Sequence, residues 1–179
     1  METVSRSTPE APGVLETERL FLRPLTFDDA PFVLELLNDP DWLRFIGDKG
    51  VRTLEDARRY IETGPFESYT KNGFGMLLVE RRTDRTPAGL CGLVRRDVLP
   101  GPDLGYAFLP AFRRQGYAVE AARAVLRFAR ETVGLERIHA ITNPDNERSI
   151  RVLDHFGFRF ERMLRLSEND EVRLYARNL

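Results

Sequence analysis

One stretch of the sequence, residues 104–133, constrains the fold more than any other. It opens with a short apolar segment, residues 104–109, which Pro110 ends, and this pattern predicts a strand. A basic loop follows, and apolar residues then recur at helical spacing until Gly134 ends the pattern. The stretch therefore predicts a strand that leads through a short basic loop into a long, alanine-rich helix.

The loop between this strand and this helix, Phe112-Arg113-Arg114-Gln115-Gly116, has the features of an anion site. Gly116 can adopt a backbone conformation closed to other residues, and the small Ala118 lets a ligand approach the helix start. The first amides of a helix lack internal partners, and the helix dipole adds partial positive charge. With Arg113 and Arg114, the segment predicts a pyrophosphate cradle, or more simply a basic turn that needs glycine. It fits neither the three-glycine dinucleotide fingerprint nor the P-loop.

The remaining segments predict an α+β domain with a mixed sheet. We expect strands over residues 16–23, 74–81, 88–96, 137–142, 158–166 and 171–176, and helices over residues 26–38, 53–63 and 146–156. Helices come first, a run of strands follows, and strands and helices then alternate, which favours this class. No repeat or linker interrupts the pattern. We expect a disordered polar tail over residues 1–14 and a single domain over residues 15–179.

Charge and hydropathy exclude several classes of function. The 179-residue chain has a formal net charge of −1, whereas a nucleic-acid-binding domain would show a basic excess. No apolar run approaches the ~20 residues that a membrane-spanning helix needs. The first residues lack the apolar stretch of a secretory signal, so we expect a cytoplasmic protein. Cys91 is the single cysteine and lies in an apolar run, which predicts a buried thiol, no internal disulfide and no metal site.

Four segments, which follow one another along the chain as they do in the family, make this sequence resemble the GNAT superfamily of N-acetyltransferases. Arg113-x-x-Gly116-x-Ala118 resembles the acyl-CoA motif of the superfamily. The other three are similar to the branch that contains ribosomal-protein N-terminal acetyltransferases. They are Glu18-Arg19-Leu20-Phe21-Leu22-Arg23-Pro24 with Asp28-Asp29-Ala30, Asp103-Leu104-Gly105-Tyr106, and Asn143-Pro144-Asp145-Asn146 through Phe156-Gly157-Phe158. The similarity covers about residues 15–177.

This resemblance implies a fold and a co-substrate. Similar proteins have a twisted, mostly antiparallel mixed sheet of about seven strands, splayed between strands four and five, and about four helices. The pantetheine arm of acetyl-CoA lies in that gap along the fourth strand, and the pyrophosphate meets the start of the long helix. Asn146 matches the family asparagine that contacts the pantetheine arm, or it is a simple helix cap. The resemblance thus assigns acetyl-CoA binding to Phe108, Leu109, Arg113, Arg114, Gln115, Gly116, Tyr117, Ala118, Asn146 and Ser149.

The resemblance also implies direct attack of a primary amine on the thioester. Many relatives use a tyrosine as the general acid, four residues before the Gly-Phe that follows the last helix. This chain has Leu153 at that position. Ser149 matches a serine proposed as the acid in the ribosomal-protein branch, or it is a helix hydroxyl bonded to a backbone carbonyl. Asp103 stands where relatives often have a glutamate base, or it is a turn aspartate. His139 and His155 are interpreted as structural.

The first two helices and residues 39–50 are expected to cover the mouth of the acceptor site. Trp42, Phe45 and Tyr69 are candidates to line it, although Trp42 also fits a core position. The acceptor remains open between a protein N-terminus, an amino acid, a polyamine and an aminoglycoside, as does the choice between monomer and homodimer. The missing tyrosine leaves a second hypothesis, a catalytically idle module that binds acyl-CoA.

Overall fold

The computed structural model describes residues 12–179, so most of the predicted tail, residues 1–14, lies outside the described part of the chain. One eight-stranded sheet has the order β1-β2-β3-β4-β5-β6-β8-β7. Neighbouring strands are antiparallel except β5 and β6, which are parallel. The strands are β1 (Leu15–Glu16), β2 (Leu20–Pro24), β3 (Met76–Arg81), β4 (Pro87–Val94), β5 (Asp103–Phe108), β6 (Arg137–Thr142), β7 (Arg159–Ser167) and β8 (Asp170–Asn178).

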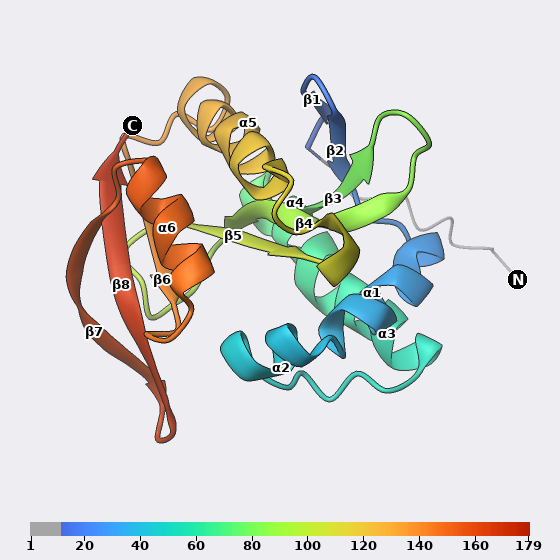
Figure 1. The fold of residues 1–179 in the computed structure, drawn as a ribbon, viewed down its shortest axis with the longest axis horizontal. Helices are drawn as coiled ribbons and strands as arrows, with labels where there is room; N and C mark the ends of the chain where they lie inside the picture. Colours follow the sequence, from blue (N-terminus) through green and yellow to red (C-terminus); the bar gives the residue numbers. More distant parts are fainter. Residues whose placement is uncertain (1–11) are drawn as a thin grey trace, which may run out of the picture.

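Helices cover both faces of this sheet (Figure 1). They are α1 (Ala30–Leu37), α2 (Pro40–Phe45), α3 (Leu54–Ile61), α4 (Glu67–Asn72), α5 (Tyr117–Glu131) and α6 (Glu147–His155). The alanine-rich side of α5 packs on one face, in a core that includes Cys91, Leu104 and Phe108. Helices α1 and α3 pack on the other face, against Leu78 and Leu90. The predicted α+β class with a mixed, mostly antiparallel sheet is therefore confirmed. Within residues 12–179, no helix is long and apolar enough to cross a bilayer.

The sheet has one strand more than predicted because the first predicted strand is a small hairpin. Residues 17–19 turn the chain between β1 and β2, which pair antiparallel. The Thr17 amide donates to the Leu20 carbonyl, and the Leu20 amide donates to Thr17 Oγ1, each at 3.0 Å. A threonine hydroxyl that bonds nearby backbone in this way stabilises a tight turn over a continuous strand.

Helix α2 was not predicted, because a proline such as Pro40 two residues after the predicted helix 26–38 is more typical of the end of a helix. Pro40 instead occupies the first turn of α2, a position where its missing amide costs nothing. Asp39 caps this helix, since its carboxylate accepts from the amides of Asp41 and Trp42.

The helix that begins after Thr53 also runs further than predicted. Its capping box is present, with the Asp56 amide donating to Thr53 Oγ1 and the Thr53 amide to Asp56 Oδ2, both at 3.1 Å. Gly64-Pro65 does not end it, because a π-helical turn, Glu62–Phe66, carries the chain into α4. Proline removes one amide and crowds the carbonyl four residues earlier, and a widened turn accommodates both effects.

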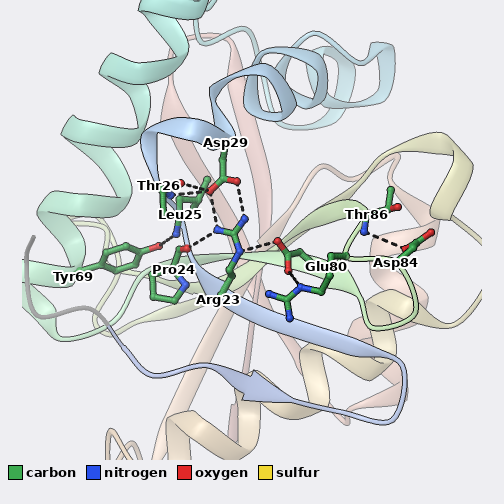
Figure 2. A network of polar contacts seen from close by, with 10 residues as sticks. Arg23, Pro24, Leu25, Thr26, Asp29, Tyr69, Glu80, Asp84 and Thr86 are labelled. Carbon is green, nitrogen blue, oxygen red and sulfur yellow. Dashed lines mark hydrogen bonds and ion pairs between the residues drawn. The ribbon is translucent and has the colours of Figure 1, made fainter.

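A buried ion network joins β2, the turn before α1 and β3 (Figure 2). The Arg23 guanidinium pairs with Asp29 at 2.8 Å and with Glu80 at 2.7 Å. Arg85 reaches the second Glu80 oxygen at 2.8 Å. Asp29 raises the pKa of Arg23 above its ordinary value, so the guanidinium stays charged. The network fixes the half of the sheet that lies beside the candidate site.

Candidate active site

The strands β5 and β6 part soon after they begin. In the described part of the chain their ladder has one registered pair, Asp103 with His139, whereas β4 and β5 pair from Gly89–Phe108 to Val94–Asp103. The middle of β5, Gly105, Tyr106 and Ala107, is partly exposed although the strand lies inside the sheet. Because β6 pairs with β5 only at Asp103, the β6-side edge of the rest of β5 is unpaired, and a gap opens along the second half of the strand.

Backbone groups of β5 line this gap. The Leu109 amide donates to the Ala88 carbonyl at 3.0 Å, and the Leu109 carbonyl accepts from the Phe112 amide. Because hydrogen-bonded pairs alternate along an antiparallel ladder, the amides and carbonyls of Tyr106 and Phe108 face away from β4. Arg113 Nε donates a hydrogen bond to the Phe108 carbonyl at 2.9 Å. The prediction that Leu109 offers free backbone groups is therefore wrong, and Tyr106 and the amide of Phe108 offer them instead.

The start of α5 presents a second set of backbone donors. Gly116 is the N-cap residue, with a left-handed φ of 80°, and Arg114 also has a positive φ of 61°. The first helical hydrogen bond runs from the Glu120 amide to the Gly116 carbonyl at 3.0 Å. Among residues 12–179, no acceptor lies within hydrogen-bonding distance of the amides of residues 114–119. This group of outward amides contains predicted ligands Arg114, Gln115, Gly116, Tyr117 and Ala118.

Arg113 does not contribute its charge to these amides. Its guanidinium nitrogens lie 2.5 Å from Asp39 Oδ2 and 2.6 Å from Asp41 Oδ2. This arginine is held by two carboxylates and a carbonyl and ties α2 to the end of β5, so its charge is directed at these groups in this structure, and its assignment as a pyrophosphate ligand stays a prediction. Arg114 is exposed, and its side chain has no partner among the described residues.

Arg19, from the turn between β1 and β2, supplies a cation that the sequence did not reveal. Its Nε lies 2.7 Å from Glu120 Oε2, and one terminal nitrogen donates to the Gln115 carbonyl at 2.9 Å. The guanidinium lies over the Tyr117 ring, 4.6 Å from its centroid. Its other terminal nitrogen is 3.3 Å from where a Cβ on Gly116 would lie. The one feature of the sequence that points to Arg19 is its place in the family-like segment of residues 18–24.

Across the gap, α6 contributes a capping amide and a hydroxyl. Asn146 caps this helix, since its Oδ1 accepts from the Ser149 amide at 3.2 Å. The Ser149 hydroxyl lies 2.9 Å from the Tyr106 hydroxyl, which is also 3.1 Å from the Ser149 carbonyl. Ser149 thus contacts a side chain of β5, and Tyr106 is a neighbour of this predicted site residue that was not predicted. Leu153 is buried in the core and brings no hydroxyl to the site.

Asp103 and His139 lie side by side where β5 and β6 begin. Asp103 is 1% exposed, and Arg96 Nε lies 3.1 and 3.2 Å from its two oxygens. Burial raises the pKa of Asp103 to about 6, while the Arg96 charge opposes that rise. His139 is also buried, its pKa is lowered chiefly by burial, and its Nδ1 has no partner. Asp103 is thus a carboxyl group poised to change charge near neutral pH, but shielded from direct contact with a ligand.

The three predicted acceptor residues have different environments. Tyr69 is 2% exposed, and its hydroxyl donates to the Met76 carbonyl and accepts from the Leu25 amide. Tyr69 is therefore a core residue, and its assignment to the acceptor mouth is wrong. Trp42 is 6% exposed and packs in the core under α2, as its alternative interpretation allowed. Phe45, in the last turn of α2, is partly exposed.

Helix α2 is tied across the site to α6. Asp41 in α2 binds Arg148 of α6 as well as Arg113. The hydrogen bond from Arg148 is the largest of the effects that lower the pKa of Asp41. Leu43 in α2 and Ile46, which caps its C-terminus, are exposed apolar side chains of the segment that these contacts hold.

Comparisons with known proteins agree with this geometry. A family model described as an acetyltransferase (GNAT) domain matches residues 19–159. YoaA of Bacillus subtilis (strain 168), an uncharacterized N-acetyltransferase, is 31% identical over 153 residues, which cover 85% of this chain and 86% of that protein. The crystal structure of the acetyltransferase from Agrobacterium tumefaciens str. C58 superposes with a TM-score of 0.78 at 25% identity, covering 99% of this chain and 98% of that one.

Ribosomal-protein acetyltransferases are also among the structural neighbours. RimL, a ribosomal L7/L12 alpha-N-protein acetyltransferase in complex with coenzyme A, has a TM-score of 0.74 at 19% identity, covering 93% of this chain and 98% of that one. Together the matches place this protein among the acetyltransferases. Because the family model spans most of the sequence, the chain belongs to the GNAT acetyltransferase domain family.

Proposed function

We propose that this protein transfers the acetyl group of acetyl-CoA to a primary amine. The observation that carries the proposal is the junction of two sets of free backbone donors, the gap edge of β5 and the start of α5. An extended pantetheine arm can pair with Tyr106 and Phe108 as an added strand would. A diphosphate can bind the amides of residues 114–119, close to Arg19 and Arg114. RimL has the same fold and binds coenzyme A, which supports this assignment.

The reaction needs little from the protein beyond positioning and hydrogen bonds. The amine nitrogen attacks the thioester carbonyl carbon, the new C–N bond forms, and the C–S bond breaks with its electron pair on sulfur. A gap-facing amide of β5 stabilises the charge that develops on the carbonyl oxygen. Ser149 meets the leaving sulfur, as the family resemblance implies, and Asn146 holds the pantetheine arm while it caps α6.

Asp103 is proposed as the base that accepts the proton of the amine. Because its carboxylate is 1% exposed, the proton reaches it through water. Asp103, Gly105 and Ala107 alternate along β5, so they share the face that α1 and α3 cover. Gly105 and Ala107 are partly exposed, which leaves a route from the gap toward Asp103. We therefore propose that the amine enters from the α2 side of the sheet.

The acceptor is proposed to be a protein N-terminus or a small primary amine. Leu43 in α2 and Ile46 just after it are exposed, 38% and 39% respectively, and the partly exposed Phe45 lies between them in sequence. This apolar border favours an amine attached to an apolar group over a free polyamine. A peptide that begins with a small or apolar residue therefore comes first in a substrate screen.

The experiment is a panel of amines with acetyl-CoA, monitored by thiol release and by the mass of the acetylated product. The panel contains peptides with different first residues, single amino acids, a polyamine and an aminoglycoside. Acetylation of at least one member is the expected result. Thermal stabilisation by acetyl-CoA without any product would instead identify an idle acyl-CoA-binding module, since ligand binding alone raises stability.

Two glycines provide a matched test of the diphosphate site. Gly116 and Gly134 flank α5 with similar φ values of 80° and 77°. Each alanine variant therefore carries a similar strain of about 1–2 kcal/mol. The Gly116→Ala variant should lose thermal stabilisation by acetyl-CoA, whereas the Gly134→Ala variant should keep it. Equal loss in both variants would contradict binding at the start of α5.

A further inference from the structure

Tyr106 stands at the point where the thioester must lie if the proposed function is right. It follows the registered pair Asp103–His139 by three residues, so it is in the part of β5 that β6 has left. Its backbone groups face the gap, while its side chain reaches α6 on the far side. The Tyr106 hydroxyl and Ser149 thus join the two walls of the gap, and a pantetheine arm that runs along β5 passes this contact.

The hydrogen bonds between Tyr106 and Ser149 can be arranged in two ways. In one, Tyr106 donates to the Ser149 carbonyl at 3.1 Å, and the Ser149 hydroxyl donates back to Tyr106. In the other, Tyr106 donates to Ser149 Oγ at 2.9 Å, and the serine hydrogen is then free for a third group. Burial keeps the pKa of Tyr106 above its ordinary value, so the phenol remains a donor at neutral pH.

From this geometry we infer that Tyr106 is a positioning residue for the leaving group: by donating to Ser149 Oγ, it aims the serine hydrogen at the thioester sulfur. A lone serine hydroxyl rotates freely and competes for backbone carbonyls. Tyr106 fixes the serine oxygen as an acceptor, so the remaining hydrogen has a defined direction. The inference rests on the proposed function and adds a residue to it.

Ser149 stabilises the sulfur without giving up its proton. A thiol has a pKa of about 8.5, and the thiolate is already a tolerable leaving group. When the C–S bond breaks, its electron pair stays on sulfur, and the Ser149 hydrogen bond shares that charge. The proton lost by the amine nitrogen goes through water to Asp103. No proton has to leave Tyr106 or Ser149, and both are ready for the next turnover.

The test is the pKa of the thiol of bound coenzyme A, measured by the ultraviolet absorbance of the thiolate during a pH titration. A hydrogen bond to the charged form lowers a pKa. Wild-type protein should therefore hold about tenfold more thiolate at a given pH than the Tyr106→Phe variant, a difference of about one pKa unit. The Ser149→Ala variant and the double variant should match Tyr106→Phe, because the two hydroxyls act as one unit.

Tyr69→Phe is the matched control, since it also removes a buried hydroxyl that bonds two backbone groups. Its bound thiol should titrate as in the wild type. A wild-type titration curve in Tyr106→Phe, or an equal shift in Tyr69→Phe, would overturn the inference. Wild-type protein that fails to bind coenzyme A would contradict the proposed function itself, so the two failures are distinguishable.

Discussion

Arg19 holds the start of α5 from a distant part of the chain. Its guanidinium joins the Gln115 carbonyl, the Glu120 carboxylate and the face of the Tyr117 ring. One terminal nitrogen remains beside Gly116, where the amides of the loop point outward. A bound anion at these amides would gain a second, charged donor from Arg19, because charge-assisted hydrogen bonds are roughly twice as strong as neutral ones.

Replacing Arg19 should therefore weaken coenzyme A binding through its diphosphate. We expect the Arg19→Gln variant to bind coenzyme A about tenfold more weakly by calorimetry, since a hydrogen bond to a charged group contributes about 1.5–3 kcal/mol and this side chain is partly exposed. Acetyl-pantetheine, which lacks the diphosphate, should bind both proteins alike. Arg82→Gln removes a similarly exposed arginine from the neighbouring β3–β4 turn, where it donates to the Thr17 carbonyl, and should leave both affinities unchanged. Equal weakening of both ligands would show that Arg19 only supports the loop.

The buried Asp103 makes folding stability depend on pH. Its folded-state pKa of about 6 is above the ordinary value of 3.8, so the folded state binds more protons between these values. The free energy of unfolding contributed by Asp103 therefore falls as pH rises from about 4 to 6, by about 2–3 kcal/mol. Urea unfolding at a series of pH values should show this fall in the wild type and in the exposed Asp97→Asn variant, but not in Asp103→Asn. Parallel wild-type and Asp103→Asn curves would contradict it.

At the scale of whole elements, α2 is too short to be stable alone, and ion pairs of its side chains hold it in place. It is one and a half turns long, with the Asp39 cap at one end and Asp41 bound to Arg113 and Arg148. A helix this short is not stable alone, so its position follows from these contacts and from the burial of Trp42. The acceptor side of the site depends on them.

Removing the Asp41 charge should loosen α2. We expect the Asp41→Asn variant to lose about 1 kcal/mol of unfolding free energy, the upper range for partly exposed ion pairs, and to show faster amide exchange in α2. Asp48→Asn breaks a more exposed pair with Arg52 outside this bridge and should leave both the unfolding free energy and the amide exchange of α2 as in the wild type. Unchanged exchange in α2 would show that packing of Trp42 suffices to hold it.

Elements with strong local signals were predicted well. The strand over residues 137–142 coincides with β6, and the helix after Gly116 and the strands over residues 74–81 and 88–96 are also confirmed. The split first strand, α2 and the π-helical turn at Pro65 were missed. Each depends on a local hydrogen bond or on packing that overrides the usual meaning of a proline or a threonine.

At the scale of the molecule, the same limit applies to the site. The glycine that begins α5 in a left-handed conformation could be predicted, because it belongs to a short motif. The binding role of Gly116 and the role of the Ser149 hydroxyl stay predictions. The partners of Arg113, and the placement of Arg19 and Tyr106 at the site, could not, because those side chains meet residues from distant segments. Arg113 pairs with Asp39 and Asp41 and the adjacent Arg114 does not, and local sequence does not reveal which of the two meets these carboxylates.

The single cysteine reports on the integrity of the entire fold. Cys91 is fully buried in β4, and burial raises the pKa of its thiol, so the reactive thiolate is scarce in the native state. We expect a disulfide exchange reagent to label it only in denaturant, while an Asp48→Cys variant gains one thiol that reacts at once. Rapid labelling of the native wild type would mean that this half of the sheet opens easily. Slow labelling also leaves thiol-release assays without background.

The parting of β5 from β6 has a consequence for the behaviour of the protein in a crowded solution. Unpaired strand edges on a surface attract other chains and promote aggregation. Here the unpaired edge of β5 lies inside the sheet, opposite α6 and near α2. The unpaired backbone groups of β5 are thus available to an extended small molecule but are shielded from the strands of other proteins.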